Sequence, residues 1–308
     1  MALTLSGFAG TFAYFFPAAR TAFEATGQVV RVPSPSPTLI PTPSPTPTGN
    51  AFTVLLLGSD DDSKFNADHV LTQSMILVRV NPTSKQVTML SIPRDLYVPL
   101  SVGGSGKIMD AYAYGGPGAA IETVQNDFQV HIDDYVWIGL NGLIHLIDAL
   151  GGIDIVATNP VMDDYHPSDV LGAYPYDYVR VAVLSGPQHV DGIRALQYVR
   201  SRHDDLQGDF GRSQRQQQVL LAIRQKAKQI SPTDIPNLAA SLNGEVKTSI
   251  ALNRVTDLVT FASGFDTEAI QQVVLLPPYT HGGTVIGGQS VLTPNWSLIL
   301  PLVHQTFP

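Results

Sequence analysis

A short uninterrupted apolar run, Phe52–Gly58, constrains the fold of this chain more than any other segment. It reads Phe-Thr-Val-Leu-Leu-Leu-Gly, and Thr53 is its only polar side chain. A strand that is apolar on both sides has to be covered on both faces, as the central strand of a buried sheet is. Strand patterns at 75–80 and 86–92 flank the turn-rich link 81–85, which predicts an antiparallel hairpin beside that central strand.

Strand and helix patterns alternate along the rest of the chain. Further strands are expected at 135–140, 153–158, 178–183 and 270–276. Helices are expected at 119–128, 142–150, 191–198, 212–229, 235–242 and 252–263. Because 44% of the 308 residues are hydrophobic, the chain can bury a substantial core. We therefore predict an α/β fold, a mixed and largely buried β-sheet flanked by helices on both faces, in one domain spanning 51–308.

Two segments of unusual composition precede this domain. Residues 2–19 are uncharged and mostly apolar, and about 20 such residues cross a bilayer as a helix. Residues 32–49 are mostly Pro, Ser and Thr, which favours extended polyproline II over a packed core. We expect 1–20 to be a membrane anchor, which is truncated if a basic segment precedes Met1 in the natural chain, and 21–50 to be a stalk outside the cytoplasm. A cleaved signal peptide and a cytoplasmic linker are the alternatives.

Four arginines are concentrated in a short stretch of an otherwise acidic chain. The formal net charge is -8 with only 18 Lys and Arg, yet the stretch contains Arg200, Arg202, Arg212 and Arg215. Guanidinium groups match phosphate oxygens and keep their charge, so this cluster predicts a local anion site. A nucleic-acid surface needs a broad basic face and a high pI, so no nucleic-acid partner is expected. A solvated helix with loose ion pairs to nearby aspartates is the alternative.

The spacing of the cluster places part of it on one helix face. Arg212, Arg215 and Gln216 are related as i, i+3 and i+4, and Gly211 just before them marks a helix start. The first turn of a helix carries unpaired N–H groups and the positive end of the dipole, and both favour a bound phosphate.

Arg200 and Arg202 are two residues apart, so they face the same side only if the chain is extended between them. The helix that begins near Asp191 is therefore expected to end around Tyr198. Both arginines would then lie in the link between two helices, next to the predicted phosphate site.

Charged residues also follow two of the predicted strands. Arg94 and Asp95 come just after the strand at 86–92, and Asp60 comes just after the apolar strand. Ligands bind at the carboxyl ends of strands in α/β sheets. A carboxylate beside an arginine pocket is a natural magnesium ligand for a phosphorylated substrate. The chain has no cysteine, which excludes thiolate metal sites and thiolate catalysis.

Taken in order, these motifs resemble one protein family. They are Leu-Leu-Leu-Gly-Ser-Asp60, Ser-Ile-Pro-Arg-Asp95, Ala111-Tyr-Ala-Tyr-Gly-Gly-Pro117, Leu150-Gly-Gly-Ile-Asp154, Tyr198-Val-Arg-Ser-Arg202 and Arg212-Ser-Gln-Arg-Gln216. From about residue 53 to 230 the chain resembles the LytR-CpsA-Psr family. The resemblance implies a membrane-attached phosphotransferase that moves a glycopolymer from a polyprenyl-diphosphate carrier to a cell-wall acceptor such as peptidoglycan. It also implies magnesium or manganese as a cofactor and an apolar cavity for the lipid tail.

The resemblance assigns roles to eight residues of this chain. Arg94, Arg200, Arg202 and Arg212 would bind the phosphates and stabilise the transition state. Arg215 and Gln216 would be supporting substrate contacts. Asp60 and Gln73 would be metal ligands.

Gln73 marks a departure from the family pattern. The family carries Arg-x-Asp-Thr before its second strand, whereas this chain reads Leu71-Thr-Gln-Ser74. An amide ligates a metal through its carbonyl oxygen but brings no charge and cannot act as a base. Asp68 and His69 are nearby substitutes. Two other functions therefore stay open, a polyprenyl-diphosphate-binding scaffold protein with weak catalysis and a prenyl-diphosphate hydrolase that uses water as the acceptor.

Overall fold

The computed structural model describes residues 51–59, 69–171, 174, 176–201, 208–229, 242, 244–250 and 270–308. The expected anchor and stalk fall outside these ranges, as do the helix expected at 252–263 and all but Leu242 of the one expected at 235–242. Within the ranges described, no helix combines the length and apolarity needed to cross a membrane.

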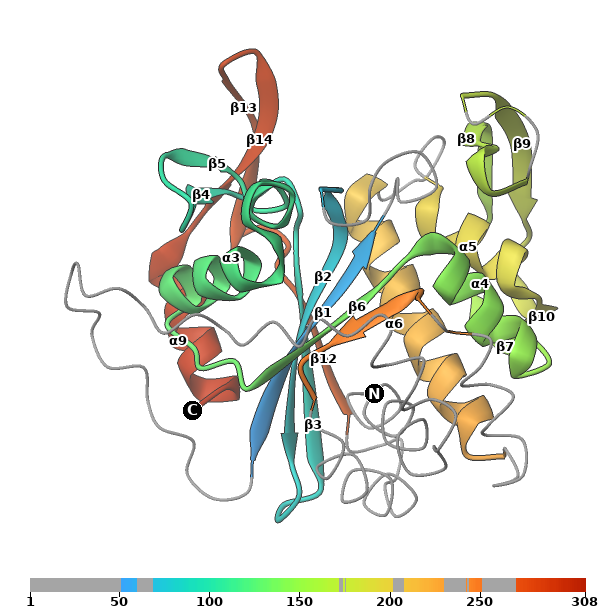
Figure 1. The fold of residues 1–308 in the computed structure, drawn as a ribbon, viewed down its shortest axis with the longest axis horizontal. Helices are drawn as coiled ribbons and strands as arrows, with labels where there is room; N and C mark the ends of the chain where they lie inside the picture. The colour runs from blue at the N-terminus through green and yellow to red at the C-terminus, as the bar shows by residue number, and fades with distance from the viewer. Residues whose placement is uncertain are drawn as a thin grey trace.

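A six-stranded mixed sheet forms the centre of the molecule (Figure 1). Its strands, in spatial order, are β11 (Val246–Thr248), β6 (Asp134–Ile138), β1 (Phe52–Ser59), β2 (Thr72–Asn81), β3 (Gln86–Ile92) and β12 (Ile270–Val274). The hairpin of β2 and β3 is antiparallel, whereas β6 runs parallel to β1 and β12 parallel to β3. β1 lies inside the sheet with nearly every residue buried, as its apolar sequence predicts.

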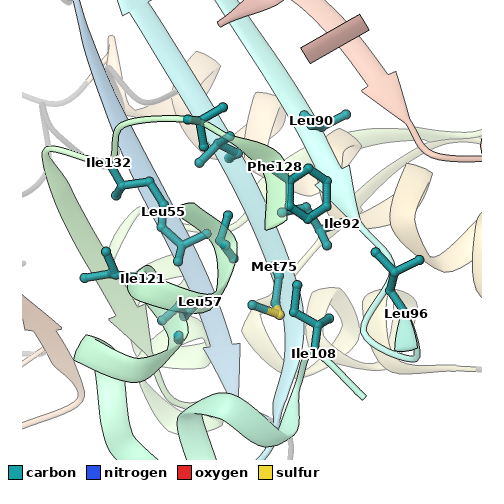
Figure 2. Close-up of a cluster of buried hydrophobic side chains, with 14 of the residues drawn as sticks. Leu55, Leu57, Met75, Leu90, Ile92, Leu96, Ile108, Ile121, Phe128 and Ile132 are labelled. Atoms are coloured by element: carbon teal, nitrogen blue, oxygen red, sulfur yellow. The ribbon is translucent and has the colours of Figure 1, made fainter. Parts of the chain in front are cut away.

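One face of the sheet is filled by a continuous apolar core. Helices α3 (Asp110–Phe128) and α9 (Trp296–Thr306) cover this face (Figure 1). Figure 2 shows Leu55 and Leu57 of β1 and Met75 of β2 packing with Phe128, and the whole cluster is buried. Alternate residues of each strand point to this face because side chains of a strand alternate between its two sides.

The other face of the sheet supports helices α4 (Leu140–Ala149), α5 (Gly192–Arg200) and α6 (Gly208–Ala227) (Figure 1). Asp191 caps α5 by accepting a hydrogen bond from the Arg194 backbone N–H at 2.8 Å. Gly192 allows α5 to approach α4 closely, since an added Cβ would lie 2.7 Å from the Cα of Ile144. The close α4–α5 contact fixes the wall opposite the sheet.

Four two-stranded ribbons complete the described part of the structure. They are β4 (Tyr97–Pro99) with β5 (Ser105–Lys107), β7 (Ile153–Ala157) with β10 (Gly186–Val190), β8 (Val161–Pro167) with β9 (Tyr178–Val183), and β13 (Thr280–Ile286) with β14 (Gln289–Pro294). The strands expected at 153–158 and 178–183 therefore exist, but they pair outside the central sheet. Their alternating burial, unlike the continuous burial of β1, suits such ribbons with one face in solvent.

Several helix boundaries differ from those expected. Helix α6 begins at Gly208 rather than just after Gly211, so Arg212 follows its first turn instead of opening it. Helix α5 continues through Arg200 and ends at Ser201, rather than near Tyr198, so Arg200 is the last helical residue. Helix α3 begins at Asp110 and includes a non-helical Gly116 followed by Pro117. These two helix breakers explain why sequence reasoning began the helix only at 119.

Candidate functional site

Three strand ends meet at one edge of the central sheet. β1 ends at Ser59, β2 begins at Thr72, and β3 ends at Ile92. The pairing of Gly58 with Ser74, and of Met75 with Ile92, places these ends side by side. β6 runs parallel to β1 and adds Ile138 to the same edge. Residues just beyond these strands are thereby brought together, as the sequence predicted for Arg94 and the polar end of β1.

An apolar cavity opens beneath this edge, between the sheet and the helices α4, α5 and α6. It contains about 790 Å³ of empty space, counting the part that is open to solvent. Aliphatic side chains from both sides line its interior, among them Leu56, Ile76 and Val136 from the sheet and Leu143, Val199 and Val219 from the helices.

Polar groups are confined to the mouth of the cavity. Arg200, Arg212, Gln73 and Gln216 line it together with the hydroxyls of Ser59 and Ser74. Among the described residues that line the cavity there is no aspartate or glutamate. The described part of the mouth thus offers two guanidinium groups, and the interior behind it is uncharged and apolar. An amphiphile with an anionic head and a hydrocarbon tail matches both parts.

Gln216 is held in a defined orientation at the mouth. The Ser74 hydroxyl donates a hydrogen bond to its Oε1 at 3.0 Å. Because Oε1 accepts this bond, the Nε2 hydrogens of Gln216 are directed away from Ser74. The next residue, Gln217, is buried and fastens α6 to the sheet by donating to the Ser91 hydroxyl at 2.7 Å and to the Val273 carbonyl at 3.1 Å.

A second, smaller pocket adjoins the first and contains Arg94. It shares Gln73, Arg212 and Gln216 with the apolar cavity, so the two openings form one continuous polar surface. Arg94 donates through Nε to Asp95 at 3.2 Å. The structure thus brings Arg94, Arg200, Arg212 and Gln216 of the predicted phosphate site to one region, with Gln73 between them.

Asp95 of this second pocket is a stably ionised group. Lys107 donates to its Oδ1 at 2.6 Å. Burial alone would raise the pKa of Asp95, but the Lys107 hydrogen bond and the charges of Arg94, Lys107 and Arg212 outweigh it and hold the pKa below its usual value. A carboxylate with a lowered pKa is a weak base, so Asp95 serves to orient Arg94 rather than to accept protons.

Arg200 reaches the cavity mouth from a buried ion pair. Its Nη1 and Nη2 donate to the two carboxylate oxygens of Asp169 at 2.9 and 3.0 Å. Asp169 belongs to a 3₁₀ turn, η1 (Asp169–Leu171), in the link between β8 and β9. The Arg200 side chain is 8% exposed and that of Asp169 is fully buried. The paired geometry fixes the plane of the guanidinium.

His166 lies near this ion pair and is neutral. Its side chain is buried, and neither ring nitrogen makes a hydrogen bond within the described structure. Burial lowers its pKa, and the positive charge of Arg200 lowers it further, although Asp163 and Asp169 act in the opposite direction. A neutral imidazole adds no positive charge beside Arg200.

Arg215 does not face the cavity. It is buried, and it donates from Nε to the Tyr198 carbonyl at 2.7 Å and from Nη2 to the Ser201 carbonyl at 2.6 Å. Its guanidinium carbon also lies 5.6 Å from the centre of the Tyr198 ring. The i, i+3 spacing with Arg212 is real, but this side chain holds the carboxyl end of α5 against α6. Arg215 therefore supports the site indirectly, through the position of Arg200.

Comparison with known proteins identifies the family. A model of the LytR_cpsA_psr family matches residues 23–297. The chain belongs to the LytR_cpsA_psr family. Its similarity to Biofilm regulatory protein A of Streptococcus mutans is 31% identity over 80% of this chain and 61% of that protein.

Two further comparisons concern TagV of Bacillus subtilis. This chain is 34% identical to that protein, named polyisoprenyl-teichoic acid–peptidoglycan teichoic acid transferase, over 71% of this chain and 55% of the relative. The chain thus spans about 55–61% of the length of the curated relatives described here. The crystal structure of TagV superposes with a TM-score of 0.68 at 29% identity, covering 83% of this chain and 95% of that one. The mixed sheet with helices on both faces is thus a fold that this chain shares with TagV.

Two residues that the LytR_cpsA_psr resemblance assigns, Asp60 and Arg202, lie outside the described residues. Ser59, immediately before Asp60, has a buried hydroxyl that makes no hydrogen bond with the described residues. Together with the Gln73 carbonyl it offers oxygen ligands of the kind that magnesium accepts. Across the described residues, no three His, Asp or Glu side chains are grouped closely enough to hold a metal ion.

Sequence reasoning missed three groups that shape this site. Asp169 and Lys107 hold Arg200 and Asp95, and Ser74 orients Gln216. Asp169 precedes Arg200 by 31 residues, so no helix or strand spacing in the sequence predicts their contact. A signal did exist for Ser74, because alternation along β2 places it on the same face as Ile76 of the cavity wall.

Proposed function

We propose that this chain transfers a glycopolymer from a polyprenyl-diphosphate carrier to a hydroxyl group of the cell wall. The observation that carries the proposal is the apolar cavity whose mouth is lined by Arg200 and Arg212. Membership of the LytR_cpsA_psr family supports it, as does the name of the B. subtilis relative, which specifies a polyisoprenyl-linked donor and a peptidoglycan acceptor.

In this proposal the lipid tail occupies the cavity and the diphosphate lies at its mouth. Each buried CH₂ contributes about 0.8 kcal/mol, so a long tail supplies most of the affinity. The arginines then orient the head rather than provide the bulk of the binding. Gln216 adds its amide N–H groups, since Ser74 already occupies the amide oxygen.

The transfer step needs positioning and charge stabilisation more than a protein nucleophile. An acceptor hydroxyl attacks the phosphorus that bears the polymer, the bond to the bridging oxygen breaks, and polyprenyl phosphate leaves while the hydroxyl proton passes to a base. Negative charge grows on the phosphoryl and leaving oxygens, and Arg94, Arg200 and Arg212 stabilise it. Loss of one such donor typically lowers the rate about 10²–10³-fold.

A divalent cation, magnesium or manganese, is part of the proposal. Asp60 would hold it, with oxygen ligands from Gln73 and Ser59. When bound, such an ion neutralises charge on the diphosphate oxygens. We further propose that residues 1–20 anchor the protein in the membrane and that the stalk at 21–50 places the domain outside the cytoplasm.

Binding of a polyprenyl-diphosphate lipid to the full chain, in detergent, tests the donor site. Arg212→Ala and Arg94→Ala should weaken binding, whereas Arg194→Ala, an exposed arginine of α5, should not. Leu143→Trp should fill part of the cavity and weaken binding of the lipid but not of inorganic diphosphate. Equal binding by all four variants and the unmodified protein would show that the cavity is not the donor site.

A second candidate, a polyprenyl-diphosphate-binding scaffold protein with weak catalysis, is favoured by Gln73, which stands where the family carries Asp. Hydrolysis with water as the acceptor would use the same pocket as transfer. Product analysis with lipid-linked donor and uncross-linked peptidoglycan separates the two reactions. Transfer leaves the polymer attached to peptidoglycan, while hydrolysis releases it free with the same loss of donor.

A further inference from the structure

The ribbon of β8 and β9 exposes aromatic side chains that no part of the described structure covers. Tyr165 is 62% exposed and Tyr178 is 63% exposed, and Tyr174 and Tyr176 in the link between the two strands are each 58% exposed. By contrast, Tyr112 and Tyr198 in the core are fully or almost fully buried. Tyrosine rings gathered on a surface offer rigid, amphipathic contact area to a partner.

Tyr165 and Tyr178 form a defined surface with two charged neighbours. The two rings pack edge to face, with centroids 6.2 Å apart and an interplanar angle of 79°. On the same ribbon, Arg180 donates to both carboxylate oxygens of Asp164, through Nε at 2.6 Å and through Nη2 at 3.4 Å. We call these four residues the tyrosine platform. Asp164 and Arg180 remain accessible, with side chains 45% and 75% exposed.

The tyrosine platform is joined to the cavity mouth by a short structural path. The same β8–β9 link contains Asp169, whose carboxylate pairs with Arg200. Figure 1 shows the ribbon projecting beyond the sheet edge at which β1 ends. A long ligand lying on the ribbon can therefore extend towards the phosphate site without leaving the protein surface.

The chemistry of the platform matches a sugar chain. Pyranose rings place their C–H faces on aromatic rings, and their neighbouring hydroxyls bind planar carboxylate and guanidinium groups. The one carboxylate of the platform, Asp164, is paired with Arg180, so the platform carries no net charge and offers no cluster of cations to a polyanionic polymer or an anionic lipid surface. We propose that the tyrosine platform binds the glycan strand of the acceptor and presents its hydroxyl to the phosphate site, an inference that rests on the proposed transferase function.

The test measures binding of soluble, uncross-linked peptidoglycan strands to the full chain by calorimetry, without donor. The double variant Tyr165→Ala/Tyr178→Ala should bind roughly tenfold or more weakly, the loss expected from two aromatic contacts. Tyr165→Phe/Tyr178→Phe keeps the rings and should bind like the unmodified protein. Tyr114→Ala is the matched control, because Tyr114 of α3 is 74% exposed and lies outside the platform.

Steady-state transfer then separates an acceptor role from a structural one. The alanine double variant should raise KM for the acceptor while leaving the affinity for polyprenyl-diphosphate lipid unchanged. Unchanged glycan binding by this variant overturns the proposal, as does a loss confined to binding of neutral or anionic lipid vesicles, or to self-association in sedimentation. If the unmodified chain binds glycan through the platform but binds no donor lipid, the platform stands and the proposed transferase function fails.

Discussion

Replacing Asp169 with alanine is expected to destabilise the protein far more than its place in a surface ribbon suggests. The substitution leaves the guanidinium of Arg200, only 8% exposed, without the two hydrogen bonds of 2.9 and 3.0 Å that Asp169 accepts. Removing one partner of a buried ion pair costs about 3–5 kcal/mol, because the other charge stays in a medium of low polarity. That is a large share of the roughly 5–15 kcal/mol by which folded domains are stable.

Urea unfolding of the unmodified protein and three variants measures this effect. Asp164→Ala is the matched control, since its pair with Arg180 has a similarly short distance of 2.6 Å but lies in solvent. Exposed pairs contribute about 0–1 kcal/mol, so this control should be nearly as stable as the unmodified protein. The double variant Asp169→Leu/Arg200→Met removes both buried charges and should recover much of the stability lost in Asp169→Ala.

Two results would refute the reasoning. If Asp169→Ala lowers the free energy of unfolding by no more than Asp164→Ala does, the Arg200 charge is not buried as the structure places it. If the double variant is less stable than Asp169→Ala, the cost arises from lost packing rather than from an uncompensated charge.

Three further predictions concern other parts of the fold. Burial raises the pKa of Asp127 to about 7. The stability of the unmodified protein should therefore fall as the pH rises from about 4, the pKa of this carboxyl in the unfolded chain, through 7. Asp127→Asn should remove this fall when unfolding midpoints are measured against pH. Gln217→Ala should cost about 1–3 kcal/mol in urea unfolding, because it leaves the buried Ser91 hydroxyl and Val273 carbonyl without their hydrogen bonds from Gln217; a change below about 0.5 kcal/mol would contradict this role. Gly192→Ala should force α4 and α5 apart and weaken lipid binding together with stability, whereas an unchanged thermal midpoint would show that the contact yields freely.

Five of the six strands of the central sheet could be predicted from the local sequence, whereas the three-residue edge strand β11 was missed. The continuous apolar run of β1 and the turn between β2 and β3 each identify a strand within a few residues. The ribbon strands β7 and β9 were expected as strands, but their partners were not, because pairing depends on contacts distant in sequence. β8 escaped notice since its bulge between Asp163 and His166 interrupts the alternation that marks a strand.

The charged residues of the candidate site could be predicted from the sequence, but the contacts that hold them in place could not. Arg94, Arg200 and Arg212 stand out in an acidic chain, and their positions at strand and helix ends bring them together. The role of Arg215 could not be read from spacing, because a buried guanidinium turns to whichever carbonyl groups need donors. Asp169 lies in a turn with no motif, and only the folded arrangement shows that it holds Arg200.

A change in side-chain volume has different consequences on the two faces of the central sheet. The face covered by α3 and α9 is filled by Leu55, Leu57 and their neighbours, so a change of volume there disturbs close packing (Figure 2). The face towards α6 borders the apolar cavity, so a side chain there contacts both packed neighbours and open space. Single substitutions at positions such as Leu56 or Val219 can therefore change the length of the cavity, and with it the size of ligand admitted, while the opposite face keeps the sheet folded.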